Sequence, residues 1–196
     1  RLGDFYEMFF DDALVASKEL EITLTGKSCG LEERAPMCGI PYHAVEGYLS
    51  KLVSRGYKVA ICEQVEDPKL AKGLVKREVI RVVTPGTNLN VQSLEAGKNN
   101  YLLSIAYTPD GIGISAADVT TGDYYVTEVE DLKKLNDELM KYEPSEIICN
   151  EAFLVSGFDV NDLKSRLHIS VNALESHMFD DDGCRRILMK HFKVNT

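Results

Sequence analysis

Three consecutive residues near the start of the chain carry side chains that could probe a nucleic-acid base. Phe5, Tyr6 and Glu7 lie in a strongly apolar segment. In an extended strand, Phe5 and Glu7 project together while Tyr6 points the other way. A flat ring then lies beside a carboxylate that accepts, or when protonated donates, a hydrogen bond. An apolar wedge inserted from the minor groove kinks duplex DNA, and a mispaired site, already poorly stacked, admits it at lower cost.

The same segment also fits a simpler interpretation. Leu2, Met8, Phe9 and Phe10 surround the tripeptide with apolar side chains. Most phenylalanines in such strands belong to the core. The residue pattern alone therefore leaves open whether Phe5 is a wedge or a buried strand residue.

Composition bounds the class of protein. With 196 residues, 44% hydrophobic and 27% charged, the chain is typical of a soluble globular protein of one large or two small domains. It has no apolar run long enough to span a membrane and no signal peptide, and it begins inside an expected strand, which predicts a fragment with a start further upstream. Five cysteines without a CxxC pair favour reduced thiols and predict no metal site.

The net charge of −9 is unusual for a DNA-binding protein. Residues 1–95 hold 12 Lys and Arg against 14 Asp and Glu, a net of −2, and the remaining −7 lies in residues 96–196. The acidity is therefore concentrated in the second half. Taken alone, the first half predicts weak affinity for phosphate.

The first half alternates strand and helix patterns and predicts a small mixed α/β domain. Acidic residues at 11–12 suit a helix start, and Gly56 suits a helix end. The expected strands are 2–10, 23–25, 37–40, 57–62 (buried) and 79–84, and the expected helices are 11–21 and 44–55. The polar stretch that follows predicts a linker at 91–99.

The second half predicts a different sheet. Strands at 101–107, 112–119 and 124–129, joined by short turns, indicate an antiparallel meander. A helical stripe formed by Leu132, Leu135, Leu139 and Met140 precedes a strand at 146–149, which we expect to be parallel to a neighbour. Further helices are expected at 159–167 and 180–192.

The chain resembles the MutS family of DNA mismatch repair proteins in several segments that occur in the same order. The resemblance is dense over residues 1–87 and looser from about 100 onward. The segments are Gly3–Phe10, Thr23–Thr25, Met37–Glu46, Ala60–Gln64 and Val82–Thr87. It implies an α/β (α+β) chain with a mismatch-recognition domain at 1–90, a linker at 91–99, and an RNase H-like connector domain at 100–196 that is incomplete at its C-terminal end.

The resemblance also implies roles for particular residues. In the family, the Phe at the position of Phe5 stacks on the mispaired base and the Glu at the position of Glu7 hydrogen-bonds it. Lys27, Lys76 and Arg77 match positions with basic residues that grip the DNA backbone, and Met37 matches a second minor-groove contact. For each of these four residues, surface charge or core packing is the alternative.

Partners and chemistry follow from the same resemblance. It implies binding of double-stranded DNA with mismatches or small loops, a homodimer in the full-length protein, a MutL-type partner for the connector, and a cytoplasmic, nucleoid-associated bacterial protein without membrane contact. The family's ATPase, with ATP and Mg²⁺, belongs to a C-terminal domain outside this chain. We therefore expect no catalysis and no cofactor here.

Gly26-Lys27-Ser28 resembles the end of a phosphate-binding loop, but residue 21 is Glu where that loop needs Gly.

Two other functions are considered. An RNase H-like nuclease would hold Mg²⁺ between facing carboxylates, and Asp118, Asp123 and Asp180 invite that comparison. The strand at 101–107 carries no carboxylate, although nuclease chemistry would need one there. A MutS homologue acting outside mismatch repair, for example in recombination, is disfavoured because such homologues generally lack the Phe-x-Glu pair.

Overall fold

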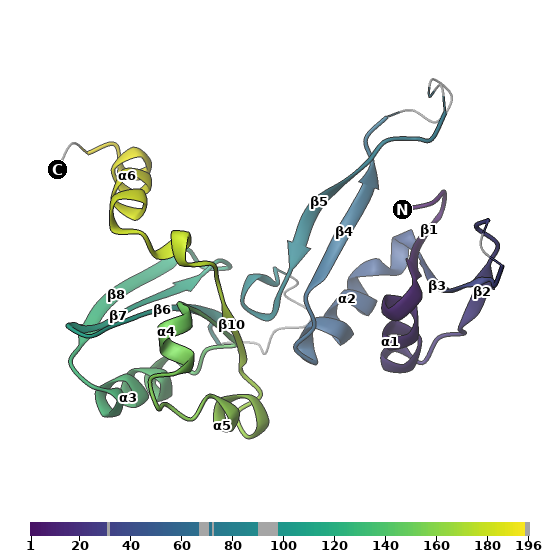
Figure 1. Ribbon diagram of the computed structural model, residues 1–196. Coiled ribbons are helices and arrows are strands. Elements are labelled where there is room, and N and C mark those ends of the chain that lie inside the picture. The colour runs from purple at the N-terminus through teal and green to yellow at the C-terminus, as the bar shows by residue number, and fades with distance from the viewer. Residues whose placement is uncertain (31, 67–70, 72, 90–97, 195–196) are drawn as a thin grey trace. The chain divides into compact units, whose positions relative to one another are not determined.

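The computed structural model describes residues 1–30, 32–66, 71, 73–89 and 98–194. The chain forms two compact units, Arg1–Glu95 and Ala96–Thr196, and each contains both helices and sheet (Figure 1). This confirms the α/β class. Most of the linker predicted at 91–99 lies outside the described residues.

The first unit contains a three-stranded sheet and a separate two-stranded ribbon. The sheet has the order β1-β3-β2 with antiparallel pairs, and the ribbon pairs β4 with β5. The elements are β1 (Phe5–Phe9), α1 (Phe10–Leu20), β2 (Thr25–Lys27), β3 (Ala35–Pro41), η1 (Tyr42–Ala44), α2 (Val45–Ser54), β4 (Val59–Gln64), β5 (Arg77–Val83) and η2 (Pro85–Thr87).

Helix α1 covers one face of the three-stranded sheet. Ala13, Ala16 and Leu20 are buried at helical spacing, and they pack with Cys38 of β3 and Leu52 of α2. The small alanine side chains allow the helix axis to lie close to the strands. The opposite face of the sheet has no helix of this unit packed on it in the described residues, and we call it the open face.

The strand predicted at 2–10 is shorter than expected. It spans Phe5–Phe9, and α1 begins at the next residue without a loop. Phe10 makes this junction with a φ of 52°, a left-handed conformation that is rare for a bulky side chain. The change from extended to helical backbone thus occurs over one residue, and this fixes the direction of α1 relative to β1.

The strand predicted at 57–62 is present as β4, at Val59–Gln64, but the prediction that it is buried is wrong. Of the β4–β5 ribbon, only Ile61 and Val83 are buried, whereas Ile80 and Val82 are more than half exposed. The register shifts between Ile61 and Cys62, as at a β-bulge. A short apolar run is compatible both with a buried strand and with a ribbon that is exposed on one side, and only the tertiary neighbours distinguish the two.

The second unit is built on a five-stranded sheet of order β10-β9-β6-β7-β8. Strands β6, β7 and β8 form the predicted antiparallel meander, and β9 is parallel to β6 as expected. Strand β10, parallel to β9, and the one-turn helix α4 were not predicted. The elements are β6 (Tyr101–Thr108), β7 (Gly111–Asp118), β8 (Asp123–Val129), α3 (Leu132–Tyr142), β9 (Glu146–Cys149), α4 (Glu151–Leu154), α5 (Val160–Ser165), β10 (Ser170–Ala173), η4 (Ser176–Phe179) and α6 (Asp181–Phe192).

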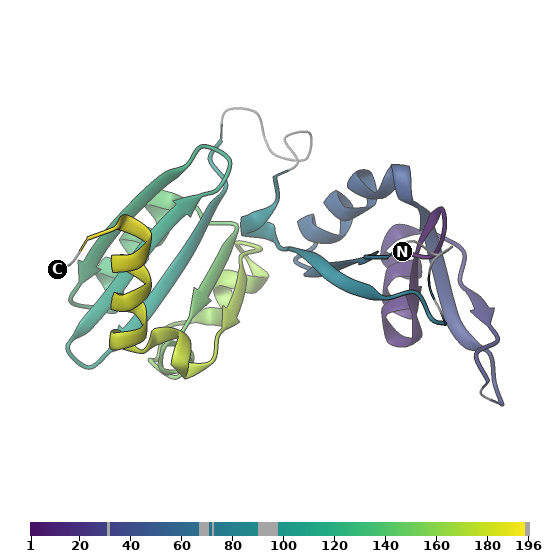
Figure 2. The ribbon, with the colours of Figure 1, turned by 90° about the horizontal axis from the view of Figure 1, so that it is seen from above.

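Helices α3, α4 and α5 pack on one face of this sheet, and α6 lies on its other side (Figures 1 and 2). The buried side chains include Leu103 and Ile105 of β6, Leu135 of α3, Phe153 of α4 and Leu163 of α5. Met140, assigned to the apolar stripe of α3 by spacing, is 43% exposed and lies at the edge of that stripe.

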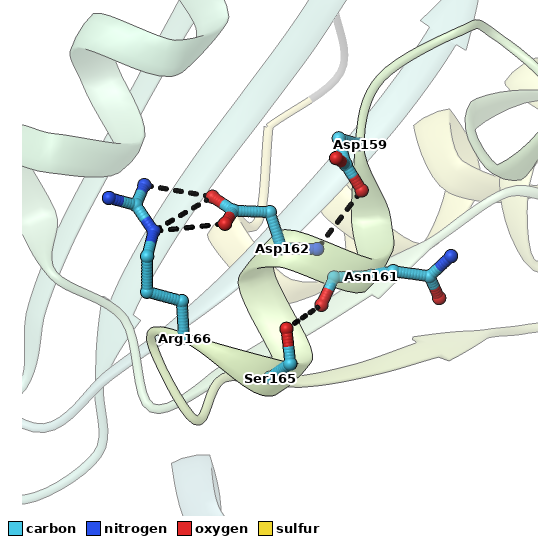
Figure 3. A network of polar contacts seen from close by, with 5 residues as sticks. All are labelled: Asp159, Asn161, Asp162, Ser165 and Arg166. Carbon is cyan, nitrogen blue, oxygen red and sulfur yellow. Dashed lines mark hydrogen bonds and ion pairs between the residues drawn. The ribbon is translucent and has the colours of Figure 1, made fainter.

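Local polar contacts define the ends of the short helix α5. Asp159 caps it by accepting a hydrogen bond from the backbone N–H of Asp162, and the Asp162 carboxylate forms a forked pair with Arg166 one turn later (Figure 3). Ser165 donates to the carbonyl of Asn161. These contacts explain why six residues with only one buried side chain, Leu163, form a helix.

Candidate nucleic-acid interface

Phe5 and Glu7 project from the open face of the sheet, next to each other. Along β1 they alternate with Tyr6, and in the register with β3 Glu7 lies opposite Gly39. A Cβ placed on Gly39 would be 3.6 Å from Glu7 Cγ and 3.8 Å from Phe5 Cδ1, so the ring and the carboxylate stem flank the same glycine. The Phe5 side chain is 47% exposed. The prediction that these two residues share a face is confirmed, and Phe5 is not a core residue of the described chain.

The register places more of the predicted site on the same face. Met37 lies opposite Phe9 of β1 and Thr25 of β2, so its side chain is on the open face, where it is half-buried. Lys27 lies opposite Ala35, which is on the same face of β3 as Met37, so the Lys27 side chain is also on the open face. The three-stranded sheet thus brings together Phe5, Glu7, Lys27 and Met37, which are separated by up to 32 positions in the sequence.

Lys27 and Glu7 form an ion pair across the sheet. Lys27 Nζ lies 2.6 Å from Glu7 Oε2, with side-chain exposures of 42% and 16%. The same ammonium group lies 5.4 Å from the centroid of the Phe9 ring, within the range of a cation–π contact. The carboxylate expected to face a base is therefore already hydrogen-bonded to a neighbouring cation.

Tyr6 anchors the strand from the opposite face. Its hydroxyl donates a hydrogen bond to the Glu63 carboxylate on β4, and its ring packs with Leu49 and Val53 of α2. Burial, the hydrogen bond and the charge of Glu63 raise the pKa of Tyr6 to about 12, so the phenol stays protonated and keeps donating. Anchoring at Tyr6 fixes which way Phe5 and Glu7 point.

Lys76 and Arg77 do not join the open face. Arg77 lies on β5 and donates from Nε to the carbonyl of Arg1 at 3.2 Å and from Nη1 to the carbonyl of Val75 at 3.0 Å. Lys76 is exposed, and its Nζ pairs with Glu78 at 2.6 Å. The structure thus gives the Arg77 guanidinium a bracing role on the N-terminal segment, while Lys76 is left at the surface.

Comparison with known proteins assigns both units. The family model described as MutS domain I matches residues 1–92, and MutS domain II matches residues 100–196. The chain belongs to the MutS family. It is 67% identical over 196 residues to DNA mismatch repair protein MutS of Lachnoclostridium phytofermentans, covering 100% of this chain and 21% of that protein.

Other relatives agree with this match. The chain is 52% identical over 199 residues to DNA mismatch repair protein MutS of Ruminiclostridium cellulolyticum, covering 100% of the chain and 23% of that protein. It is 53% identical over 196 residues to that of Acetivibrio thermocellus, covering 98% of the chain and 22% of that protein. The chain thus spans about a fifth of the length of these curated MutS relatives.

The carboxylate considered for nuclease chemistry has a structural role in the MutS domain II unit. Asp118, at the end of β7, is 1% exposed and accepts hydrogen bonds from the backbone N–H of Asn100 and from the backbone and hydroxyl of Thr120. Burial by itself would raise the pKa of Asp118, but these hydrogen bonds outweigh burial and hold it below its usual value. The carboxylate therefore closes the turn after β7 and holds the start of β6.

Other candidate groups can be placed within the described part of the chain. All five cysteines lie there and are free thiols. In that part no cluster of three or more His, Cys, Asp and Glu side chains has the spacing of a metal site, and no helix is both long and apolar enough to cross a membrane.

Sequence reasoning missed two features of this MutS domain I site. One is the ion pair between Glu7 and Lys27. The other is Gly39, which has no side chain and so leaves space next to Phe5 and Glu7. Both depend on the register of β1 and β2 against β3. The alternation in 35–41, where buried Cys38 and Ile40 flank Gly39, is the one local signal that could have indicated the face.

Proposed function

We propose that this chain recognises mismatched DNA for a MutS protein through its first unit. Phe5 stacks on a mispaired base from the minor groove, and Glu7 hydrogen-bonds that base. The observation that carries the proposal is the placement of a 47% exposed ring and a carboxylate side by side over Gly39, inside a MutS domain I. Met37, on the same face, is positioned to touch the groove beside them.

The energetics favour a probing role over a gripping role. Inserting a ring requires the unstacking of a base step, which is unfavourable by roughly a few kcal/mol. Unstacking is less unfavourable at a mispaired step. Residues 1–95 carry a net charge of −2, which supplies little phosphate affinity. The remainder of a MutS protein, as a dimer with its ATPase, would therefore hold the duplex while this unit tests it.

The second unit would act as the connector in this scheme. We assign it no catalysis and no cofactor, and we propose that it links the recognition unit to the ATPase and to a MutL-type partner. A cytoplasmic, nucleoid-associated location follows from the same proposal.

A competition experiment tests the recognition step. The intact protein is titrated against a labelled duplex with one G·T mismatch and against an otherwise identical paired duplex. Base–aromatic stacking contributes roughly 1–3 kcal/mol per base, so Phe5→Ala should weaken mismatch binding by about tenfold and leave paired binding nearly unchanged. Phe10→Ala is the matched control, because Phe10 is 53% exposed, close to Phe5 in exposure, but sits at the helix start.

The outcomes separate clearly. Loss of mismatch preference in Phe5→Ala with retention in Phe10→Ala supports the proposal. Equal effects of both substitutions, or retention of preference in Phe5→Ala, would exclude Phe5 as the wedge.

A further inference from the structure

The contact between Lys27 and Glu7 assigns Lys27 a function other than gripping phosphate. We propose that Lys27 is a positioning residue for Glu7: it orients the carboxylate and offsets its charge, so that Glu7 can enter the groove. The inference rests on the proposed function and deepens it, because it names what makes an acidic probe compatible with DNA. The ion pair at 2.6 Å is the observation behind it.

The strand register explains why this pair forms across two strand spacings. Strands β1 and β2 lie on either side of β3, so Glu7 and Lys27 are two strand spacings apart, roughly 9–10 Å across the sheet. Their β3 partners are four residues apart, so the two positions are also offset by roughly 13 Å along the strands. The β3 residues directly opposite them, Gly39 and Ala35, present almost no side chain, and Met37 lies between these two on the same face. The long Lys27 side chain therefore crosses β3 obliquely, and it reaches the carboxylate beside the Phe9 ring.

The surroundings hold the ammonium group in this position. Glu7 Oε2 lies on one side of Lys27 Nζ, and the Phe9 ring lies 5.4 Å away. The Glu7 side chain is only 16% exposed, so its charge is partly shielded from water, and an unpaired carboxylate there would lack compensation. Lys27 remains 42% exposed and is accessible to solvent above the pair.

This arrangement matters because DNA is negatively charged. An ionised Glu7 alone would be repelled by the phosphates that line the groove, and the repulsion would act on mismatched and paired duplexes alike. With Lys27 beside it, the probe approaches the groove as a neutral pair. The carboxylate oxygen that Lys27 leaves free can then accept a hydrogen bond from the base.

A double-mutant cycle distinguishes this role from a phosphate contact. The intact protein is prepared as wild type, Glu7→Gln, Lys27→Met and the double variant, and dissociation constants are measured for the G·T duplex at several salt concentrations. Coupling between contacting charged groups corresponds to roughly twofold to a hundredfold in affinity. We expect Lys27→Met to weaken binding about tenfold when Glu7 is present and less than about twofold in the Glu7→Gln background.

Salt dependence and rescue give independent readouts. In the Glu7→Gln background, removing Lys27 should leave the slope of log affinity against log salt unchanged, whereas loss of a phosphate contact would reduce it by about one. Lys27→Arg should retain wild-type affinity, since Arg also pairs with a carboxylate. Thermal unfolding of each variant checks that the fold is intact.

The inference is overturned if Lys27→Met causes equal losses in both backgrounds and lowers the salt slope in both, because Lys27 would then contact phosphate directly. Phe5→Ala, measured in the same series, separates this failure from a failure of the proposed function. If Phe5→Ala abolishes mismatch preference while the cycle is additive, only the role of Lys27 is wrong. If Phe5→Ala retains the preference, the recognition proposal itself is wrong.

Discussion

Replacing Phe5 by Ala should destabilise the first unit only slightly. Full burial of a Phe side chain contributes roughly 1.5–3 kcal/mol relative to exposure. The ring is 47% exposed, so about half of that, or about 1 kcal/mol, is at stake. A change of this size lowers the melting temperature of a domain of 60–100 residues by about 4–8 °C.

Leu20→Ala in the same unit provides the comparison. Leu20 is 4% exposed and packs in the core between α1 and the sheet, so its truncation should cost roughly 2–5 kcal/mol. Hydrogen exchange followed by mass spectrometry suits the measurement, because it reports the first unit separately from the second. The two variants should therefore differ clearly in the protection of β1 and β3.

The reasoning fails if Phe5→Ala loses as much protection as Leu20→Ala. Phe5 would then contribute to the core, and a ring needed for packing could not leave the sheet to enter a base step. A loss confined to the ends of β1 would instead agree with an exposed ring.

Three further predictions concern Tyr6 and Gly39 at the candidate interface and Asp118 in the second unit. Burial, together with the hydrogen bond and the charge of Glu63, raises the pKa of Tyr6 to about 12. The stability linked to its protonated phenol is therefore fully present below the unfolded value of about 10 and is lost as pH rises through about 12. Tyr6→Phe should lack this alkaline loss of about 2 kcal/mol in denaturant titrations. The pKa of Asp118 is lowered, so its contribution to folding stability is present above its usual pKa and is lost as pH falls through the lower folded value. Asp118→Asn should reduce the free energy of unfolding by about 2 kcal/mol at neutral pH and make stability less dependent on pH in the acid range. An unchanged stability would contradict the hydrogen-bond network. Gly39→Val should fold, as circular dichroism can verify, but lose mismatch preference because its methyl groups occupy the space between Phe5 and Glu7, whereas Gly39→Ala, with its nearest contact at 3.4 Å, should retain most of it.

The sequence predicted those parts of the fold that depend on neighbouring residues. The alternation of Phe5, Tyr6 and Glu7 is a property of any extended strand. It is present here because the Tyr6 ring packs against the buried side chains of Leu49 and Val53. The meander of β6, β7 and β8 followed from turn residues at the right spacing. The helix α3 followed from leucines at helical spacing and from Asp131, which caps its first turn.

Features that depend on distant residues were harder to predict. One side of the β4–β5 ribbon is exposed, and the local sequence pattern does not indicate this because it depends on which other elements pack nearby. Strand β10, with the sequence Ser170–Ala173, has few residues typical of strands and exists because β9 offers an edge. The ion pair of Lys27 with Glu7 depends on two strand registers, that of β1 with β3 and that of β2 with β3. The family resemblance implied a DNA backbone contact for Arg77, and nothing nearby in sequence indicated the carbonyl of Arg1 as an acceptor.

A photochemical crosslink tests the central proposal most directly. A G·T duplex carrying 5-iodouracil in place of the mispaired thymine is irradiated in complex with the intact protein, and the crosslinked peptide is identified by mass spectrometry. We predict an adduct on Phe5, because a ring stacked on the mispaired base is the nearest aromatic group, and no such adduct with the paired duplex. Adducts on other residues with none on Phe5, or equal adducts on both duplexes, would contradict insertion of Phe5 at the mismatch.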